Sequence, residues 1–86
     1  MIQDTSLEAY FLLESDLGRM QSFIFNIIRE YPDVSNLDIA RITGKPINSV
    51  TPRVKELRDK GLVFFNGYKI DRITKRRVMC WSVLNK

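Results

Sequence analysis

The chain has 86 residues with 44% hydrophobic and 28% charged residues, an ordinary globular composition that excludes a disordered chain and leaves room for one small domain. Histidine is absent and Cys80 is the only cysteine, which excludes Cys/His zinc sites, disulfide frameworks and His-based catalytic dyads. The formal net charge is +4, and its distribution along the chain is more informative than its size. We therefore expect a single domain over residues 1–86.

The first predicted element is a helix over about residues 5–15, with Asp4 or Thr5 as its cap. Apolar residues cover nearly two of its sides, at Leu7, Ala9, Tyr10, Phe11, Leu12 and Leu13. A helix that is apolar on two sides has to be covered twice, once by its own domain and once by a second subunit. Residues 1–15 are therefore a candidate dimerisation element, and the alternative is a partly frayed terminal helix.

The second predicted helix follows Asp16 as its N-cap and ends before Pro32, which cannot continue a helix. Its apolar residues recur three and four positions apart, at Leu17, Met20, Phe23, Ile24, Ile27, Ile28 and Tyr31. This spacing is typical of an amphipathic helix. Phe25 lies off the stripe, where we expect it to contact the first helix or a partner.

A short third helix is predicted from Asn36 to about Thr43. Ser35, with Asp38 three residues later, is a variant of the capping box that accepts unpaired N–H groups at a helix start. Ile39 and Ala40 would face inward, and the small Ala40 would let the next helix cross closely. Gly44 is expected to end the helix in the left-handed conformation.

The fourth predicted helix runs to about Lys60, with Gly61 as its stop. Its core face holds Val50, Val54 and Leu57. Because proline is tolerated in the first turn of a helix, Pro52 indicates a cap at or near Asn48. Residues 44–47 would then form the turn between the two helices.

Beyond Gly61 the pattern predicts a β-ribbon. Residues 62–65 and 68–73 are rich in strand formers, and residues 78–84 form a last strand in which Met79, Trp81 and Val83 share one face. Residues 74–76 make a polar, basic tip. Asn66-Gly67 indicates either a tight turn or a bulge in one long strand, and the sequence does not decide between them.

Charge is distributed unevenly, with a balance of −5 up to Ala40 and +9 after it. The second half therefore points to an anionic partner, with nucleic acid the commonest candidate and a membrane surface or an acidic protein as the alternatives. Asparagine, serine, threonine and arginine on an exposed helix face can read base edges and phosphates, and lysine can pair with phosphates. The candidate helix residues, with one from the preceding turn, are Lys45, Asn48, Ser49, Thr51, Arg53 and Lys55.

The ribbon adds a second cluster of candidate phosphate-binding residues. A hairpin that served only as a turn would not need so much like charge, which repels itself. Its basic residues are Lys69, Arg72, Lys75, Arg76 and Arg77. If about six of the basic groups each neutralise one phosphate, the log-log salt slope of binding is about −5.

The segment from Ser35 to Val83 resembles small bacterial and phage winged helix-turn-helix proteins. The resemblance lies in residues 35–40, Gly44, residues 46–57 and residues 60–63, and it continues through residues 74–76 to a strand that carries Trp81. It implies an α+β fold in which the helix from about residue 48 to 60 is the recognition helix and residues 72–77 form the wing. The sequence departs from the family pattern at Lys75, where the family often has glycine, and in its acidic N-terminal helix.

We therefore expect a cytoplasmic protein that binds double-stranded DNA as a transcriptional regulator, without catalysis, cofactor or metal. The recognition helix would lie in the major groove and the wing on the backbone or minor groove. No apolar run reaches the roughly 18 residues that cross a bilayer, and the first residues lack the pattern of a signal peptide. The alternative is a winged helix that binds a host or replication protein through its acidic half or through Phe25 and Phe64. Asp71 alone lacks the clustered ligands that a nuclease metal site needs.

Overall fold

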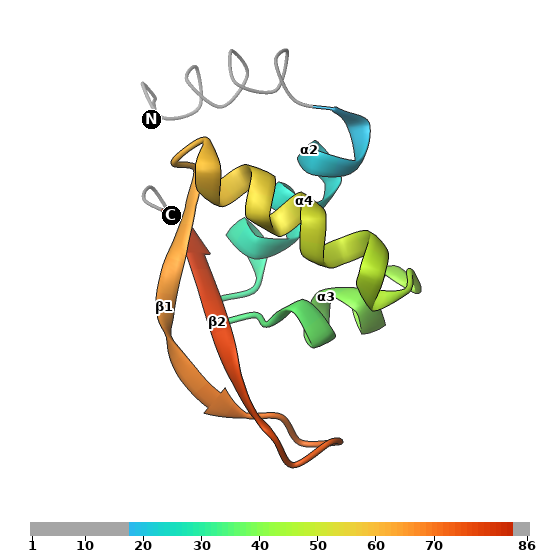
Figure 1. The fold of residues 1–86 in the computed structure, drawn as a ribbon, viewed down its shortest axis with the longest axis vertical. Helices are drawn as coiled ribbons and strands as arrows, with labels where there is room; N and C mark the ends of the chain where they lie inside the picture. The colour runs from blue at the N-terminus through green and yellow to red at the C-terminus, as the bar shows by residue number, and fades with distance from the viewer. Residues whose placement is uncertain (1–17, 84–86) are drawn as a thin grey trace.

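The computed structural model describes residues 18–83, which form three helices followed by a two-stranded antiparallel ribbon (Figure 1). This arrangement confirms the predicted α+β class. The elements are α2 (Arg19–Glu30), α3 (Asn36–Thr43), α4 (Ile47–Asp59), β1 (Val63–Ile70) and β2 (Arg77–Val83). No helix in this part of the chain combines the length and the apolar character needed to cross a membrane. The predicted helix over residues 5–15, and the dimerisation assigned to it, lie outside the described residues.

Helix α2 begins later than predicted. Its N-cap is Gly18 rather than Asp16, and the side chain of Gln21 accepts the backbone N–H of Gly18 at 3.1 Å. This contact occupies an N–H at the start of the helix without a carboxylate cap.

The stripe of α2 also differs at two aromatic positions. Ile24, Ile27 and Ile28 are buried as expected, whereas Phe23 is 45% exposed and Phe25 is buried at 6%. Phe25 stands 100° round the helix from Ile24, so the buried face extends to that side and leaves Phe23 in solvent. Phe25 is therefore buried and is not an exposed partner contact, while the alternative, contact with the first predicted helix, lies outside the described residues.

Helix α3 and its ends are as predicted. The Ser35 hydroxyl accepts the N–H of Asp38 at 3.1 Å, and the Asp38 carboxylate accepts the N–H of Ser35 at 3.1 Å. Gly44 has φ of 74°, and its N–H bonds to the Ala40 carbonyl at 2.8 Å. Ile39 is fully buried, and Ala40 packs against the core.

Helix α4 starts one residue before the predicted cap. Its N-cap is Pro46, and Asn48 lies within the first turn instead of capping it. Pro52 consequently lies in the second turn rather than the first. The N–H that proline lacks is the one that would bond the carbonyl of Asn48, so the helix tolerates this loss near its N-terminal end. Gly61, with φ of 77°, ends the helix as predicted.

Asn66-Gly67 is a bulge in one long strand, which settles the alternative left open by the sequence. The register pairs Phe65 with Trp81 and then Tyr68 with Met79, so two residues of β1 lie opposite Cys80 alone. Gly67 has φ of 98°, a conformation that suits glycine. Strand β1 ends at Ile70 instead of continuing to Ile73, which leaves residues 71–76 as the loop at the tip.

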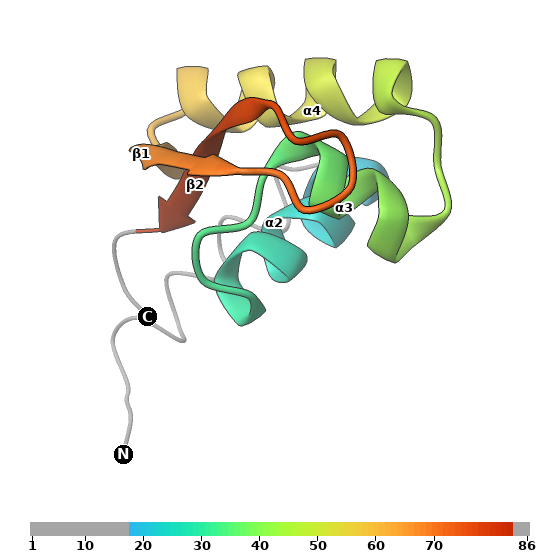
Figure 2. The same ribbon diagram turned by 90° about the horizontal axis from the view of Figure 1, so that it is seen from below.

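The ribbon packs on the helices near its base, and its tip extends beyond them along the long axis of the molecule (Figure 1). Seen from below, α4 runs along one side of the molecule and α2 lies on the other (Figure 2). Trp81 accounts for much of the attachment of the ribbon. Its backbone N–H bonds to the Val34 carbonyl at 2.9 Å, and its indole N–H donates to Asn36 at 2.8 Å. Trp81 and Val83 are buried, whereas Met79 on the same face is 37% exposed because it lies farther out along the ribbon. Cys80 is also buried, and burial raises the pKa of its thiol.

Candidate nucleic-acid interface

The outer face of α4 presents part of the predicted helix set to solvent. Asn48, Thr51 and Lys55 are exposed, while Val50 and Val54 on the opposite side are fully buried. Lys45 is exposed in the turn before the helix. Lys55 also forms an ion pair with Asp59 at 3.1 Å, one turn further on, and both of these side chains are mostly exposed. An exposed pair of this kind is weak and can be exchanged for a phosphate contact.

Ser49 and Arg53 lie on the flank of α4 and are only partly exposed. Arg53 donates to both carboxylate oxygens of Glu56, at 2.8 and 2.7 Å. The same carboxylate accepts Gln21 of α2 at 2.5 Å, so this flank faces α2. The Arg53 and Gln21 hydrogen bonds hold the pKa of Glu56 below its usual range. Arg53 would have to leave Glu56 before it could pair with a base.

The loop over residues 71–76 is anchored by one carboxylate. Asp71 is 1% exposed, and its two oxygens accept both NH groups of Arg41 in α3 at 2.8 and 2.9 Å. It also accepts the N–H of Ile73 at 3.2 Å and the N–H of Thr74 at 2.8 Å. The hydrogen bonds from Arg41 and Thr74 hold the pKa of Asp71 far below its usual range. The loop over residues 71–76, which is the wing, is thereby fixed to α3.

The basic residues of the ribbon divide into two groups. Lys69 is partly buried and bonds to Asp38 of α3, so its charge is already matched within the fold. Burial acts to raise the pKa of Asp38, but the hydrogen bonds from Lys69 and Ser35 outweigh it and lower that pKa. By contrast, four exposed basic residues of the tip have no ion pair within residues 18–83: Arg72, Lys75, Arg76 and Arg77.

Lys75 adopts a left-handed backbone conformation, with φ of 65°, at the position where the resemblance implies glycine. Its N–H bonds to the Asp71 carbonyl at 2.9 Å, and the Asp71 N–H bonds to the Arg76 carbonyl at 2.8 Å, which together close the loop. The loop therefore keeps a charged side chain at a position where glycine would be unstrained.

We expect Lys75→Gly to stabilise the fold by about 0.5–1 kcal/mol, because glycine adopts this conformation without strain. Denaturant unfolding would measure the change. Lys75→Ala, which removes the charge but keeps the strain, should leave the stability close to that of the wild type. Equal stabilities for the glycine and alanine variants would contradict this account.

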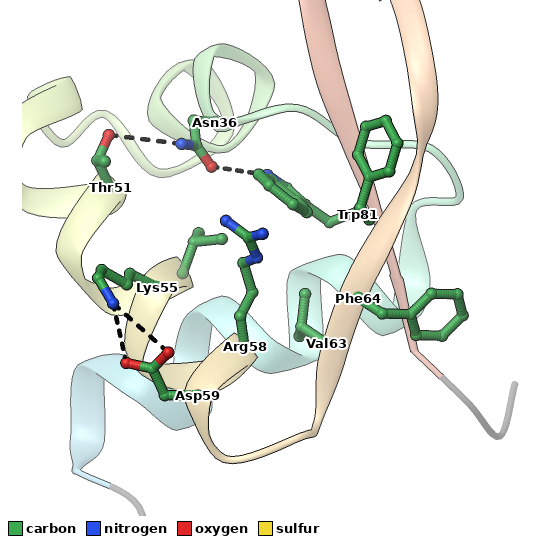
Figure 3. Close-up of a pocket in the computed structure, with 10 residues that line it drawn as sticks. Asn36, Thr51, Lys55, Arg58, Asp59, Val63, Phe64 and Trp81 are labelled. Atoms are coloured by element: carbon green, nitrogen blue, oxygen red, sulfur yellow. Dashed lines mark hydrogen bonds and ion pairs between the residues drawn. The ribbon is translucent and has the colours of Figure 1, made fainter.

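Sequence reasoning missed Arg58, which lies between α4 and the ribbon. Its guanidinium lies 4.6 Å from the centre of the Trp81 ring. Figure 3 shows it reaching from α4 toward Trp81 and Asn36, beside Lys55 and Asp59. Arg58 follows the buried Val54 by four residues, and this spacing could have placed it on the edge of the core face.

Arg58 crosses a groove of about 500 Å³ between α4 and the ribbon. The lining comes from α3, α4, β1 and β2 and includes Asn36, Thr51, Val63, Phe65 and Trp81. Asn36 links the sides of the groove, because it accepts the Trp81 indole and donates to Thr51 at 3.5 Å. The Phe64 side chain points away from the other labelled residues (Figure 3).

The chemistry available at this surface is that of anion and base recognition. Exposed amide, hydroxyl and basic side chains lie along α4, and basic side chains gather at the wing tip. Within residues 18–83 no group of three or more Cys, Asp or Glu residues is placed to hold a metal ion. The described surface offers hydrogen-bond donors and positive charge.

Comparison with known proteins agrees with this geometry. The family model described as winged helix-turn-helix DNA-binding matches residues 24–63, which span most of α2, all of α3 and α4, and the start of β1. None of the curated proteins compared with the chain matches it. The family match supports DNA binding.

Proposed function

The chain is a winged helix-turn-helix protein, and from this premise we propose that it binds double-stranded DNA as a transcriptional regulator. Helix α4 would enter the major groove, and the wing would contact the backbone or the minor groove. The observation that carries the proposal is the selective pairing of the basic residues. Carboxylates match Arg41 and Lys69, which hold the wing in place, while no carboxylate within residues 18–83 pairs with the tip.

The lack of acidic partners at the tip within residues 18–83 matters, because such partners would cancel the attraction of the tip for phosphates. Arg72, Lys75 and Arg76 are exposed on a loop whose backbone is fixed by Asp71. A fixed loop loses less conformational entropy on binding than a mobile one. The tip is thus suited to neutralising phosphates, while residues on α4 are suited to reading bases.

Fluorescence anisotropy of a labelled duplex over a range of salt concentrations tests the proposal. Affinity should fall steeply with salt, because neutralising phosphates releases counterions. No binding even at low salt would overturn it. Salt-insensitive binding would also contradict it, because phosphate contacts could not then supply the affinity.

We assign base reading to Asn48 and Thr51, the exposed polar residues in the first half of α4. Asn48→Ala should weaken binding to a preferred site by about tenfold or more, because a bidentate contact contributes roughly 1–3 kcal/mol of discrimination. The site would first be selected from a random duplex library. The variant should keep the wild-type salt slope on non-specific DNA, whereas a reduced slope would make Asn48 a phosphate contact.

We further propose that the protein binds as a homodimer through residues 7–13. The proposal rests on the apolar character of that segment, and two half-sites would lie about one helical turn apart. Sedimentation should show a dimer whose population rises with concentration, and Leu12→Asp should reduce it. A wild-type protein that stays monomeric at high micromolar concentration would remove the proposal.

A further inference from the structure

Three aromatic rings form a row along the ribbon, beginning in the groove beside α4. The ring centres of Trp81 and Phe65 lie 6.4 Å apart, and those of Phe65 and Tyr68 lie 5.1 Å apart. Both contacts are edge to face. The strand register places all three on one face of the ribbon, since Phe65 pairs with Trp81 and Tyr68 pairs with Met79 beyond the bulge.

An arginine lies over the ring at each end of this row. Arg58 of α4 covers Trp81 at 4.6 Å, and Arg77 of β2 covers Tyr68 at 4.3 Å. Neither arginine has an ion pair within residues 18–83. Both guanidinium groups therefore keep an unmatched positive charge beside the rings.

The outer rings are open to a ligand. Phe65 is 41% exposed and Tyr68 is 55% exposed, whereas Trp81 is buried. The groove that begins the row has a volume of about 500 Å³, which is within the range of small-ligand sites, roughly 300–1,000 Å³. Exposed rings combined with cations are the features with which proteins hold unpaired bases and their phosphates.

We propose that this face binds single-stranded nucleic acid, with bases stacked on Phe65 and Tyr68 and phosphates paired with Arg58 and Arg77. The site shares Arg77 with the basic tip, but its rings set it apart from the proposed duplex site, because bases inside a duplex do not offer their faces to a protein ring. The charges select this occupant over an apolar protein surface. A protein partner would have to bring its own carboxylates to the two arginines, whereas every nucleotide carries a phosphate beside a stacking base.

The test measures anisotropy of a labelled oligothymidine of about eight nucleotides, a length within the usual site sizes for single-strand binding. A labelled hairpin duplex serves as the parallel probe. Tyr68→Leu keeps an apolar side chain but removes the ring, and it should weaken single-strand binding by about tenfold while changing duplex binding by less than about twofold. Tyr68→Phe keeps the ring and should retain single-strand binding.

Ile70→Ala is the matched control, because Ile70 is an exposed apolar residue on the same face but has no ring. It should leave single-strand affinity unchanged. Trp81 is the only tryptophan in the chain, so its intrinsic fluorescence reports on the groove in the wild type. Addition of unlabelled oligothymidine should change that fluorescence if Arg58 engages the strand.

The outcomes separate this site from the duplex function. Duplex binding without single-strand binding overturns this inference and leaves the proposed function standing. Single-strand binding that depends on Tyr68, without duplex binding, supports the inference and overturns the proposed function. If Tyr68→Leu binds the single strand as tightly as the wild type, the rings do not stack bases and the face serves an apolar contact such as a protein partner, which overturns the inference.

Discussion

Replacing Lys75 and Arg76 together by alanine is expected to weaken duplex binding by about 60-fold at 0.1 M salt. Each neutralised phosphate contributes about 0.9 to the log-log salt slope, so two lost contacts lower the slope by about 1.8. If the wild type and the double variant bind equally at 1 M salt, a slope difference of about 1.8 over one decade of salt gives the expected loss of about 60-fold at 0.1 M. Both side chains are exposed and form no ion pair within residues 18–83, so their charge can be given wholly to the ligand.

Lys60→Ala is a suitable control for this experiment. Lys60 is exposed at the C-terminal cap of α4, at the opposite end of that helix from its candidate base-reading residues. It should change duplex affinity by about twofold or less, because a charge distant from the phosphates acts only through a screened field. Parallel salt plots for the double variant and the wild type would show that the wing does not contact phosphates.

Replacing Asp71 by asparagine is expected to produce the largest loss of stability among the charged residues discussed here. An amide has one acceptor oxygen in place of two, so it cannot accept both NH groups of Arg41 as a carboxylate does, and it also gives up the ion pair. Thermal unfolding should show a melting temperature below that of the wild type. Duplex affinity should also fall, because a released wing must be ordered again on binding.

The pH dependence of the melting temperature distinguishes the loss of the Asp71 charge from a general packing defect. The pKa of Asp71 is held below its ordinary value of 3.8, so the folded state favours the ionised form. Its contribution to stability is therefore complete above about pH 5 and is lost as the pH falls below about 4. The melting temperatures of wild type and Asp71→Asn should differ most near neutral pH and converge in acid.

Asp59→Asn provides the matched control for Asp71→Asn. Asp59 pairs with Lys55 at 3.1 Å, but its side chain is 66% exposed, and exposed pairs add little stability. Its melting temperature should stay close to that of the wild type across the same pH range. A constant difference between wild type and Asp71→Asn from neutral pH into acid would contradict the role assigned to the Asp71 charge.

Local signals predicted the helix order and the ends of α3 well. Ser35, Asp38 and Gly44 act through hydrogen bonds and dihedral angles within a few residues of themselves, so their effects can be read from the chain. The predicted starts of α2 and α4 were wrong because the residues at these two starts lack such local signals. Gly18 is the N-cap of α2, and its N–H donates to the Gln21 side chain. Pro46 is the N-cap of α4 and makes no side-chain hydrogen bond, so neither start carries the usual sequence signal.

The candidate site could be predicted only in part from the sequence. Counting charges identified the basic wing, but it could not separate Lys69, which pairs with Asp38, from Lys75, which has no pair within residues 18–83. Likewise, the outward set on α4 included Arg53, which bonds to Glu56 on the flank facing α2. Asp71 was considered only as an isolated carboxylate, because its partner Arg41 lies thirty positions earlier in the chain.

The sequence by itself determined the order of the helices and the basic ribbon that follows them. Periodicity, caps and turn residues act locally, and the charge excess of the second half can be counted from the residues alone. Tertiary structure alone decided which charges are available for a ligand and where the aromatic rings meet. Ion pairs such as Arg41–Asp71 and contacts such as Arg58 over Trp81 join residues distant in sequence. Their formation depends on how α3, α4 and the bulged ribbon pack, and no local pattern records that packing.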